Sequence, residues 1–414
     1  MLCMWRTVPS PSMLSNTKPF REELVRAIPS RPFTVELWDG TSLPSTNGGG
    51  PTFEVRSPDA FAHALRAPGQ LGLGRAYVSG ALGVDDLDDA LELLDGWEPP
   101  PLDRRAQARL ALAAARASGL RRPPRAPRSE LRPRGRRHSP ERDARAVRHH
   151  YDVSNDFFKL FLGESLNYSC ALFSRGAKTL EEAQEAKLEL VCTKLALEPG
   201  QRVLDVGCGW GSFVLHAAAN HGVSVVGITL SEPQARLARE RAAERGLADR
   251  VEIRVADYRE VGDEPFDAVA SIGMVEHVGA AQIDVYARQL AQLVRPGGRV
   301  LNHGIARLRV GDPEAGPFSE RYVFPDAAPL HLSRIQTAME RAGLETEHVE
   351  GLRSDYAETL RHWARNLDDN LDEAVRLAGP ERIRVWRLYV RAARRGFESG
   401  FTSIYQVRCR RPTS

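Results

Sequence analysis

The sequence predicts an α/β fold built on a mostly parallel sheet, and two observations carry this prediction. From Tyr151 onward, short apolar runs alternate with longer segments that show helical periodicity. The first of these runs, VLDVGCGWGS at 203–212, stops at a glycine-rich turn. Strands that alternate with helices form parallel sheets covered on both faces. Such sheets bind ligands beyond the carboxyl ends of their strands, so the turn is a candidate binding site.

The composition bounds the class of protein. With 42% hydrophobic and 27% charged residues, the 414-residue chain is expected to be globular and to hold two or three domains. No apolar run reaches the ~18 residues of a membrane-spanning helix, and the N-terminus lacks the apolar core of a signal peptide, so we expect a cytoplasmic protein. The five cysteines show neither CxxC nor Cys/His spacing, so neither a disulfide framework nor a metal site is expected.

The N-terminal part is expected to hold a small α+β domain. We expect residues 1–20 to be disordered and residues 21–98 to fold. FTVELWDG (33–40) alternates like a strand that ends in an Asp-Gly turn, and DDLDDALELLDGW (85–97) has helical spacing after an acidic start. The glycine-rich LGLGRAYVSGAL (71–82) follows no strand and precedes no clear helix, so we interpret it as a structural turn.

Residues 99–149 are predicted to be a mobile linker. Residues 101–150 contain 15 arginines, no lysine and only four acids, and five prolines within 121–140 argue against a continuous helix there. One interpretation is a solvated spacer. The other is that the guanidinium groups engage phosphates, either of anionic lipids or of nucleic acid. The arginine run alone does not decide between them.

The second half supplies the elements of the predicted sheet. A capping box at Thr179 and Glu182 opens a helix that Pro199-Gly200 ends. The remaining pattern predicts strands at RVLDVG (202–207), VSVVGITL (223–230), VEIRVAD (251–257), FDAVASIGM (266–274) and RVLNHGIARL (299–308), and helices at 212–221, 232–246 and 281–294.

The glycine spacing distinguishes the turn from two familiar nucleotide loops. Gly207, Gly209 and Gly211 alternate, whereas a dinucleotide fold has G-x-G-x-x-G and a phosphate loop needs Gly-Lys-Ser/Thr. Together with Asp205, the arrangement resembles motif I of the class I S-adenosylmethionine-dependent methyltransferases. Three glycines beside an aspartate make a purely structural turn a poor explanation.

Further motifs resemble one family of these enzymes. HYDVSNDFFKLFLGESLNYSCALF (150–173), SIGMVEHVG (271–279), RYVFPDA (321–327) and GFESGFTSIYQV (396–407) are similar to the cyclopropane-fatty-acyl-phospholipid synthases, which include the mycolic acid cyclopropane synthases. The resemblance implies a Rossmann-like methyltransferase domain with a seven-stranded, mostly parallel sheet over residues 150–414. Residues 21–98 would match the extra domain of the long members, and LGLGRAYVSGAL looks most like the actinobacterial ones.

The resemblance implies an unusual methyl acceptor, the cis double bond of an unsaturated acyl chain in membrane phospholipid. The alkene takes the methyl group of S-adenosylmethionine, and a bound bicarbonate ion removes a proton from the resulting carbocation. Ring closure gives a cyclopropane. A preceding hydride shift gives a 10-methylene chain, the precursor of 10-methyl branched acids such as tuberculostearic acid. Both products stay open, and both routes need a dry pocket.

The family's site residues carry over to the positions that match here. Taken singly, Cys170, His303 and Tyr356 could each be ordinary core residues, so their combination carries the prediction. The resemblance assigns a bicarbonate cradle to Cys170, Glu276, His303, Ile305 and Tyr356. It assigns cofactor binding to Tyr168, Ser169, Asp205, Gly207, Gly209, Gly211, Thr229, Leu230, Gln234, Asp257 and Tyr258.

Two positions depart from common patterns. Thr229-Leu230 stands where many class I methyltransferases have an acid, a departure that the cyclopropane synthases share. Val275 stands where the family usually has an aromatic residue, and the smaller side chain could widen the pocket or alter the fate of the cation. Residues 312–340 are expected to supply much of the acyl tunnel. Residues 387–407 are expected to be helical, either packed on the sheet or facing phospholipid headgroups.

The expected partners follow from the same resemblance. We expect peripheral association with the inner face of the membrane, a reductase partner if the product is 10-methylene, and no nucleic acid; a homodimer is also considered. Two rivals are a non-catalytic lipid- or RNA-binding protein on a degenerate methyltransferase fold, and a small-molecule methyltransferase. The intact glycine turn and the complete cradle argue against the non-catalytic rival.

Overall fold

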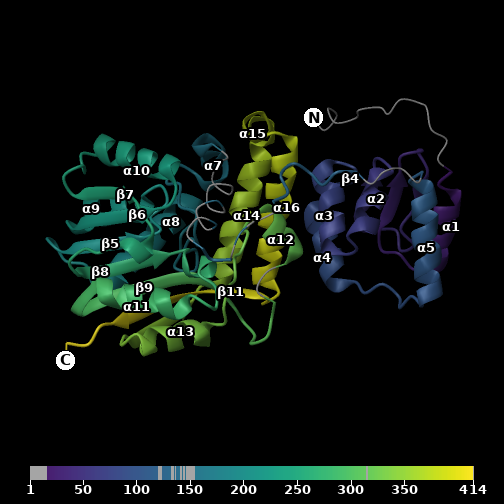
Figure 1. Cartoon of the computed structure of the whole chain (residues 1–414). Helices are drawn as coiled ribbons and strands as arrows, with labels where there is room; N and C mark the ends of the chain where they lie inside the picture. Colours follow the sequence, from purple (N-terminus) through teal and green to yellow (C-terminus); the bar gives the residue numbers. More distant parts are fainter. Residues whose placement is uncertain are drawn as a thin grey trace. The chain divides into compact units, whose positions relative to one another are not determined.

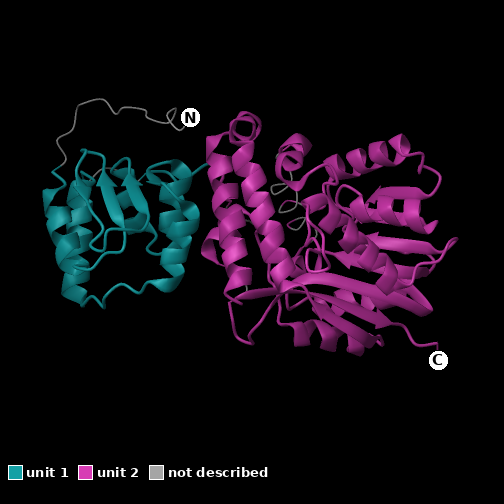
Figure 2. Ribbon diagram, turned by 180° about the vertical axis from the view of Figure 1, so that it is seen from behind, with its two compact units in different colours: residues 1–128 teal, residues 129–414 magenta. Residues whose placement is uncertain are grey.

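The structure is a computed structural model that describes residues 16–119, 124–131, 135, 137–139, 142, 145, 154–313 and 316–413. The chain divides into two compact units, residues 1–128 and 129–414 (Figure 2). Most of the predicted disordered N-terminus lies outside the described residues. The prediction is wrong for its last residues, because a helix begins at Lys18 and buries Phe20 and Leu24.

The first unit is a small α+β fold around a four-stranded sheet. The sheet has the order β2-β1-β3-β4, with β1 and β3 parallel and the outer pairs antiparallel. Its strands are β1 (Thr34–Leu37), β2 (Ser42–Leu43), β3 (Thr52–Val55) and β4 (Leu82–Val84). Its helices are α1 (Lys18–Ala27), α2 (Asp59–Arg66), α3 (Gln70–Ser79), α4 (Leu87–Gly96) and α5 (Arg104–Ala117).

Helix α5 corrects the predicted linker. The Asp103 side chain caps the helix by accepting a hydrogen bond from the Ala106 N–H. Three small residues on one face, Ala113, Ala114 and Ala117, are buried in the core that also holds Phe20 of α1. Alanine lets two helices approach closely, so residues 104–117 belong to the folded unit. The prediction of a linker is wrong for this segment.

Helix α3 corrects the interpretation of LGLGRAYVSGAL as a turn. Residues 70–79 are helical and bury Ala76, Tyr77 and Val78. A Cβ atom on Gly72 would lie 2.2 Å from the Ala67 carbonyl oxygen and 2.8 Å from that of His63. Glycine is therefore needed here because the end of α2 approaches the α3 backbone more closely than any side chain allows.

The second unit contains the predicted seven-stranded sheet (Figure 1). Its order is β10-β11-β9-β8-β5-β6-β7, and only β11 runs antiparallel to its neighbours. The strands are β5 (Arg202–Val206), β6 (Ser224–Thr229), β7 (Val251–Val255), β8 (Phe266–Ile272), β9 (Val294–Arg307), β10 (Glu345–Gly351) and β11 (Thr402–Arg410). The predicted fold class, including the five strands expected from periodicity, is confirmed.

Helices cover both faces of this sheet because alternate strand residues are buried on opposite sides. Val203 of β5 packs with α8 (Leu180–Leu195), α9 (Ser212–His221) and α10 (Glu232–Glu244). Leu204 packs on the other side with α11 (Ile283–Leu293) and α13 (Leu332–Arg341). Helix α13 lies in the segment predicted to form an acyl tunnel, but Ile335, Ala338 and Met339 are core residues beneath the sheet.

A second helical layer forms an aromatic core beside the sheet. It consists of α7 (Asn155–Leu162), α14 (Arg353–Asp369), α15 (Leu371–Ala378) and α16 (Pro380–Glu398), and α14 and α16 run side by side (Figure 1). Phe157, Phe158, Phe161, Trp363 and Trp386 are buried there. The helix predicted for 387–407 ends at Glu398, and β11 pairs with β9 and β10 from Thr402 onward. The prediction of a helix is wrong for residues 402–407, because the edges of β9 and β10 form hydrogen bonds with an extended strand between them.

Within the described residues, none of the helices combines the length and the apolar character required to cross a bilayer.

The close contact at Gly72 yields a stability prediction. Gly72→Ala should destabilise the first unit by about 1–3 kcal/mol, the usual cost of overpacking, because the new methyl group overlaps two backbone oxygens. Gly96→Ala is the matched control, since nothing lies within 4 Å of its Cβ position. Hydrogen exchange of residues 59–84 in the full chain should rise in the first variant and not in the second. Equal exchange in both variants would contradict the packing argument.

Candidate active site

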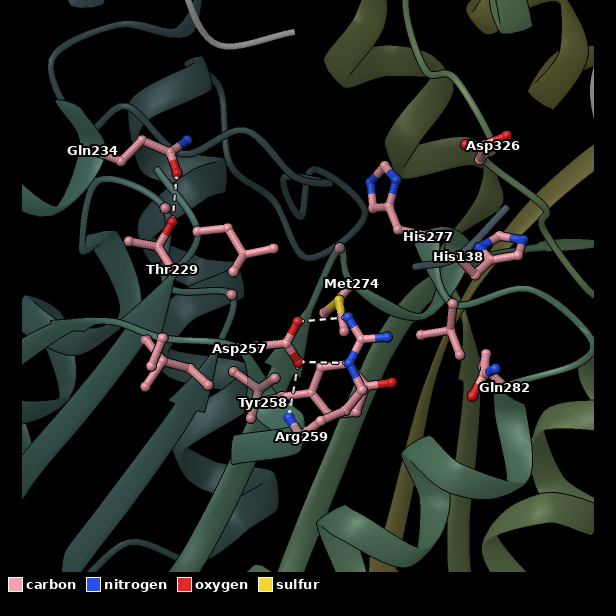
Figure 3. A pocket seen from close by; sticks show the side chains of 18 of the residues that line it. His138, Thr229, Gln234, Asp257, Tyr258, Arg259, Met274, His277, Gln282 and Asp326 are labelled. Atoms are coloured by element: carbon pink, nitrogen blue, oxygen red, sulfur yellow. Dashed lines mark hydrogen bonds and ion pairs between the residues drawn. The ribbon is translucent and has the colours of Figure 1, made fainter. Parts of the chain in front are cut away.

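A pocket opens at the carboxyl ends of β5, β6 and β8, where the fold predicts a ligand (Figure 3). Seven of the predicted cofactor residues line it: Gly207, Gly209, Thr229, Leu230, Gln234, Asp257 and Tyr258. Gly207 and Gly209 have φ values of +86° and +54°, which disfavour any side chain. Their backbone therefore forms part of the pocket wall directly. Gly211 does not line the pocket; it packs against Ala238 and precedes α9.

The turn after β6 presents an amide to the pocket. The Thr229 hydroxyl donates to Gln234 Oε1 over 2.9 Å, and both side chains are buried (Figure 3). Ser231 caps α10 by accepting a hydrogen bond from the Gln234 N–H. Since the amide oxygen of Gln234 is used by Thr229, its NH₂ group is the part available to donate to a ligand. The structure thus brings together Thr229, one of the two residues that stand in place of the usual acid, and the predicted cofactor residue Gln234.

Asp257, after β7, is held by a residue that sequence reasoning missed. Arg259 Nε lies 2.8 Å from Asp257 Oδ1, and its terminal nitrogen lies 2.5 Å from Oδ2 (Figure 3). The Arg259 guanidinium also lies 5.3 Å from the Tyr258 ring centre. This short stretch begins the 3₁₀ helix η1 (Tyr258–Glu260) and lines the pocket with three side chains. The sequence offered one signal for Arg259, its position directly after the predicted residues Asp257 and Tyr258.

Three other predicted cofactor residues do not line this pocket. Ser169 and Asp205 are buried in a polar network around Lys187, which donates to Asn167 Oδ1 over 3.0 Å and to Ser169 Oγ over 2.8 Å. Tyr168 packs its ring 5.3 Å from that of Trp363 in the aromatic layer. Neither Lys187 nor Asn167 was predicted, because a lysine within an ordinary amphipathic helix gives no sign that it is buried.

Burial shifts the ionisation of this network. Burial raises the pKa of Asp205 to about 7, although the charge of Lys187 opposes the shift. Burial lowers the pKa of Lys187 to about 8, with Cys170 and Asp205 opposing. Asp205 Oδ1 has no hydrogen-bond partner among the described residues. The network therefore retains an acceptor that a polar ligand could satisfy.

Glu276, His303 and Ile305 of the predicted cradle lie together. Glu276 belongs to the 3₁₀ helix η2 (Val275–His277) after β8, and His303 and Ile305 lie on the neighbouring strand β9. Glu276 Oε2 lies 3.1 Å from the position that a Cβ on Gly304 would occupy. Burial raises the pKa of Glu276 to about 7, against backbone hydrogen bonds to its carboxylate from Glu276 itself and Ile305.

Two buried polar atoms of this group lack partners among the described residues, Glu276 Oε2 and His303 Nε2. A buried polar atom without a partner is costly, so such atoms mark places where a ligand binds or a water is held. One carboxylate oxygen and one imidazole nitrogen are a suitable donor and acceptor set for a small oxyanion.

The protonated nitrogen of His303 is fixed by a chain of hydrogen bonds that the sequence did not reveal. Lys194 Nζ donates to Gln406 Oε1 over 2.6 Å, and Gln406 Nε2 lies 2.8 Å from His303 Nδ1. Lysine can only donate, so the Gln406 amide must turn its NH₂ group toward His303. His303 Nδ1 therefore accepts. Burial keeps the pKa of His303 well below its usual value, so the neutral ring carries its proton on Nε2.

Cys170 and Tyr356 lie in the apolar cluster against which Ile305 packs. The Cys170 thiol points toward the Ala171 and Leu352 carbonyl oxygens, and burial raises its pKa well above the usual value. It is therefore a neutral thiol rather than a nucleophile. The Tyr356 ring lies 4.7 Å from that of Phe397. All five predicted cradle residues thus fall in two adjoining groups, one polar and one apolar.

The prediction of a linker is also wrong for some later residues, because they form part of the outer wall of the pocket. From Ser129 onward the described residues of this segment belong to the second unit, where Arg137 and Arg142 both form ion pairs with the buried Asp326. The Leu131 N–H donates to the Arg321 carbonyl oxygen. His138 and residues 324–326 therefore line the pocket together (Figure 3). A buried carboxylate that needs cations explains why these two arginines lie at the pocket wall. Within the predicted linker, residues 120–123, 132–134, 136, 140–141, 143–144 and 146–149 lie outside the described residues.

The strand order, the antiparallel β11 and the pocket at the glycine turn define a class I S-adenosylmethionine-dependent methyltransferase. The model of the mycolic acid cyclopropane synthetase family matches residues 138–407, and the chain belongs to this family.

Similar proteins cover nearly the whole chain. A probable fatty acid methyltransferase of Mycobacterium tuberculosis is 40% identical over 399 residues, covering 93% of this chain and 92% of that protein. The tuberculostearic acid methyltransferase UfaA1 of the same organism is 32% identical, with coverage of 91% and 87%. The cyclopropane-fatty-acyl-phospholipid synthase of Escherichia coli is 33% identical, with coverage of 87% and 88%.

Among solved structures, the mycolic acid cyclopropane synthase CmaA1 complexed with SAH and CTAB superposes with a TM-score of 0.61 at 32% identity. The superposition covers 65% of this chain and 98% of that one.

The raised pKa of Glu276 yields a pH prediction. Glu276 should titrate near 4.5 in the unfolded chain and near 7 in the folded one. Between these values the folded protein keeps a proton that the unfolded chain has lost, so raising the pH lowers the free energy of unfolding. Glu276→Gln removes this contribution. The melting temperature of the variant minus that of the parent should therefore be larger at pH 8 than at pH 5. An equal difference at both pH values would contradict the shift.

Proposed function

We propose that this enzyme transfers one carbon from S-adenosylmethionine to the cis double bond of an unsaturated fatty acyl chain in membrane phospholipid. One observation carries the proposal. The pocket lined by the glycine turn adjoins a buried carboxylate and a buried imidazole, each with a polar atom that has no partner among the described residues. The names of the relatives, a fatty acid methyltransferase and a cyclopropane-fatty-acyl-phospholipid synthase, support the same acceptor.

Within this proposal, each part of the site has a role. The bound S-adenosylmethionine supplies an electrophilic methyl group. The Gly207 and Gly209 backbone and the Gln234 amide hold it at the carboxyl edge of the sheet. Asp257 is neutralised by Arg259, so this part of the wall contributes hydrogen bonds without adding a net charge.

The residues fit a bicarbonate ion, which would serve as the base that removes the proton. Glu276 Oε2 would accept from its hydroxyl group, and His303 Nε2–H would donate to its oxygen. The neutral thiol of Cys170 and the ring of Tyr356 border the same place on the apolar side. Phe158, Trp363 and Trp386 keep that side dry, which protects a carbocation from water.

The proposal covers two products. Ring closure gives a cyclopropane, and a hydride shift before proton loss gives a 10-methylene chain. Relatives named for each product are almost equally similar, at 33% and 32% identity, so similarity does not favour either. Val275 is fully buried, and its Cγ1 lies 2.2 Å from a Cβ position on Gly304. Val275 therefore packs against the strand that carries His303.

Peripheral membrane binding is part of the proposal, but α16 supports it only weakly. Arg387 and Arg391 both pair with Asp368, and Arg394 and Arg395 pair with Glu398. The cationic face expected from the sequence is thus partly neutralised by acids of the same unit. If the product is the 10-methylene chain, a reductase partner is expected to convert it into the 10-methyl chain.

The product itself is the test. The chain is expressed in a host that is rich in cis-monounsaturated phospholipid and lacks its own cyclopropane synthase, and the lipids are studied by proton NMR. Mass does not separate the two isomers. The proton spectrum is expected to contain either high-field cyclopropane signals or vinylidene signals. Glu276→Gln should lose product by about 10²–10⁴-fold while still binding S-adenosylmethionine. Full activity in this variant would refute the role of Glu276, and absence of both signals from the parent would refute the proposed acceptor.

Gln406 is proposed as a positioning residue that acts through His303. In Gln406→Glu the introduced carboxylate cannot donate to Nδ1, so the proton moves to Nδ1 and Nε2 can no longer donate. Losing a hydrogen bond to a charged group costs about 1.5–3 kcal/mol, so kcat should fall about 10- to 100-fold. The KM for S-adenosylmethionine should not change.

The ¹⁵N chemical shifts of the His303 ring report its tautomer directly. A variant that only disturbs packing would leave this tautomer unaltered. Gln289→Glu is the matched control, because Gln289 lies on α11 and donates to the Val261 carbonyl oxygen just after η1, away from this group. Loss of activity with an unchanged His303 tautomer would count against the positioning role.

A further inference from the structure

Three side chains of types that commonly bind metal ions lie close together on α8 and α9. These helices cover the face of the sheet opposite to α11 and α13. Cys192 lies on α8, and His216 and His221 lie on α9. The thiol sulfur and one nitrogen of each imidazole all lie within 4.8 Å of one another. Cys192 is fully buried, and the side chains of His216 and His221 are only 9% and 19% exposed.

A carboxylate contacts the two imidazoles of this group. Glu189, one helical turn before Cys192 on α8, places Oε2 3.2 Å from His216 Nε2 and 3.0 Å from His221 Nε2. Glu189 therefore bridges the two imidazoles and is a candidate for a fourth ligand, through an oxygen. The group contains one sulfur, two nitrogens and one oxygen, and it draws equally on α8 and α9.

We propose that Glu189, Cys192, His216 and His221 form a zinc-binding site. Zinc takes four ligands in a tetrahedron, at about 2.0–2.1 Å for nitrogen and about 2.3 Å for sulfur, which sets the ligand atoms about 3.3–3.6 Å apart. The carboxylate–imidazole distances of 3.0 and 3.2 Å are hydrogen-bond distances slightly shorter than this spacing, so the carboxylate would move outward as the ion enters. The ligand atoms of Cys192, His216 and His221 lie within 4.8 Å of one another, and rotation of these side chains would bring them to the required spacing.

The donor set favours zinc over other common cations. Magnesium and calcium bind oxygen ligands, whereas thiolate and imidazole together select zinc. Binding would release the Cys192 thiol proton, and each imidazole would turn a lone pair toward the ion. Asn220 lies 3.1 Å from His216 Nδ1. Reversal of its amide would let the Asn220 oxygen accept a hydrogen bond from that nitrogen, as the partners of metal-bound histidines commonly do.

The site lies apart from the candidate active site. The pocket adjoins the turn before Ser212, the first residue of α9, whereas His221 is the last residue of that helix. A zinc ion would join α9 to α8, and α8 also carries Lys187 and Lys194 of the polar networks described above. We therefore assign the ion a structural role that is independent of the proposed reaction.

Metal content and spectroscopy of the full chain test this site. Protein without an affinity tag is purified, its zinc is measured, and the chelated protein is titrated with Co²⁺. One equivalent of Co²⁺ should bind and give a thiolate-to-cobalt charge-transfer band. Cys192→Ser should abolish that band, and His221→Asn should weaken cobalt binding at least 10-fold. Because His221 is partly exposed, its variant tests the site even if the cysteine variant does not fold.

Two matched controls separate this site from incidental binding. Cys409→Ser changes another buried thiol and His331→Asn changes a surface histidine, and neither should alter the band or the affinity. Added Zn²⁺ should also raise the melting temperature of the parent and of both controls, but not that of His221→Asn. No binding at one equivalent, or a cobalt spectrum that Cys192→Ser leaves unchanged, would overturn the proposal.

Discussion

The parallel pairing of β5 with both β6 and β8 is the constraint on which the rest of the second unit depends. A chain that enters each parallel strand from the same edge must leave each at the opposite edge, so every turn that follows a strand meets its neighbours there. The glycine turn, the Thr229–Gln234 pair, Asp257 and Glu276 come together for this reason alone. Apolar residues on both faces of β5 hold the arrangement, because they pack against helices on either side.

The same edge of the sheet collects buried ionisable groups, and the fold stabilises them by hydrogen bonds that come from distant segments. Lys187 is satisfied by Asn167 and Ser169, and His303 by Gln406. The partner of His303 lies on β11, the antiparallel strand inserted beside β9. An added strand that completes the sheet therefore also selects the tautomer of a candidate catalytic group. This coupling explains why a glutamine rather than an apolar residue lies inside a central strand.

Charge decides what the arginine-rich segment does. Prolines and arginines without alternating apolar residues give no sign of a fold, yet Asp326 recruits Arg137 and Arg142 to the pocket wall. An exposed ion pair contributes little to stability, but an acid that is only 4% exposed requires its cations. Part of a segment that would otherwise be a spacer thereby becomes one side of the candidate cofactor site.

The sequence by itself determined the fold class, the five alternating strands and the family, because apolar periodicity and the Asp205–Gly211 motif are local signals. Through the family resemblance it also identified seven of the residues that line the pocket, most of which lie just after a strand. Only the tertiary structure decided that residues 70–79 and 104–117 are helices of the first unit, since close packing at Gly72 and Ala117 outweighs weak local preferences. Likewise, Lys187, Arg259, Gln406 and the Cys192–His216–His221 group acquire their roles from neighbours distant in the chain or from burial. Spacing along the sequence does not record burial or contact between separate elements, and these are what decide whether a polar side chain is part of a site.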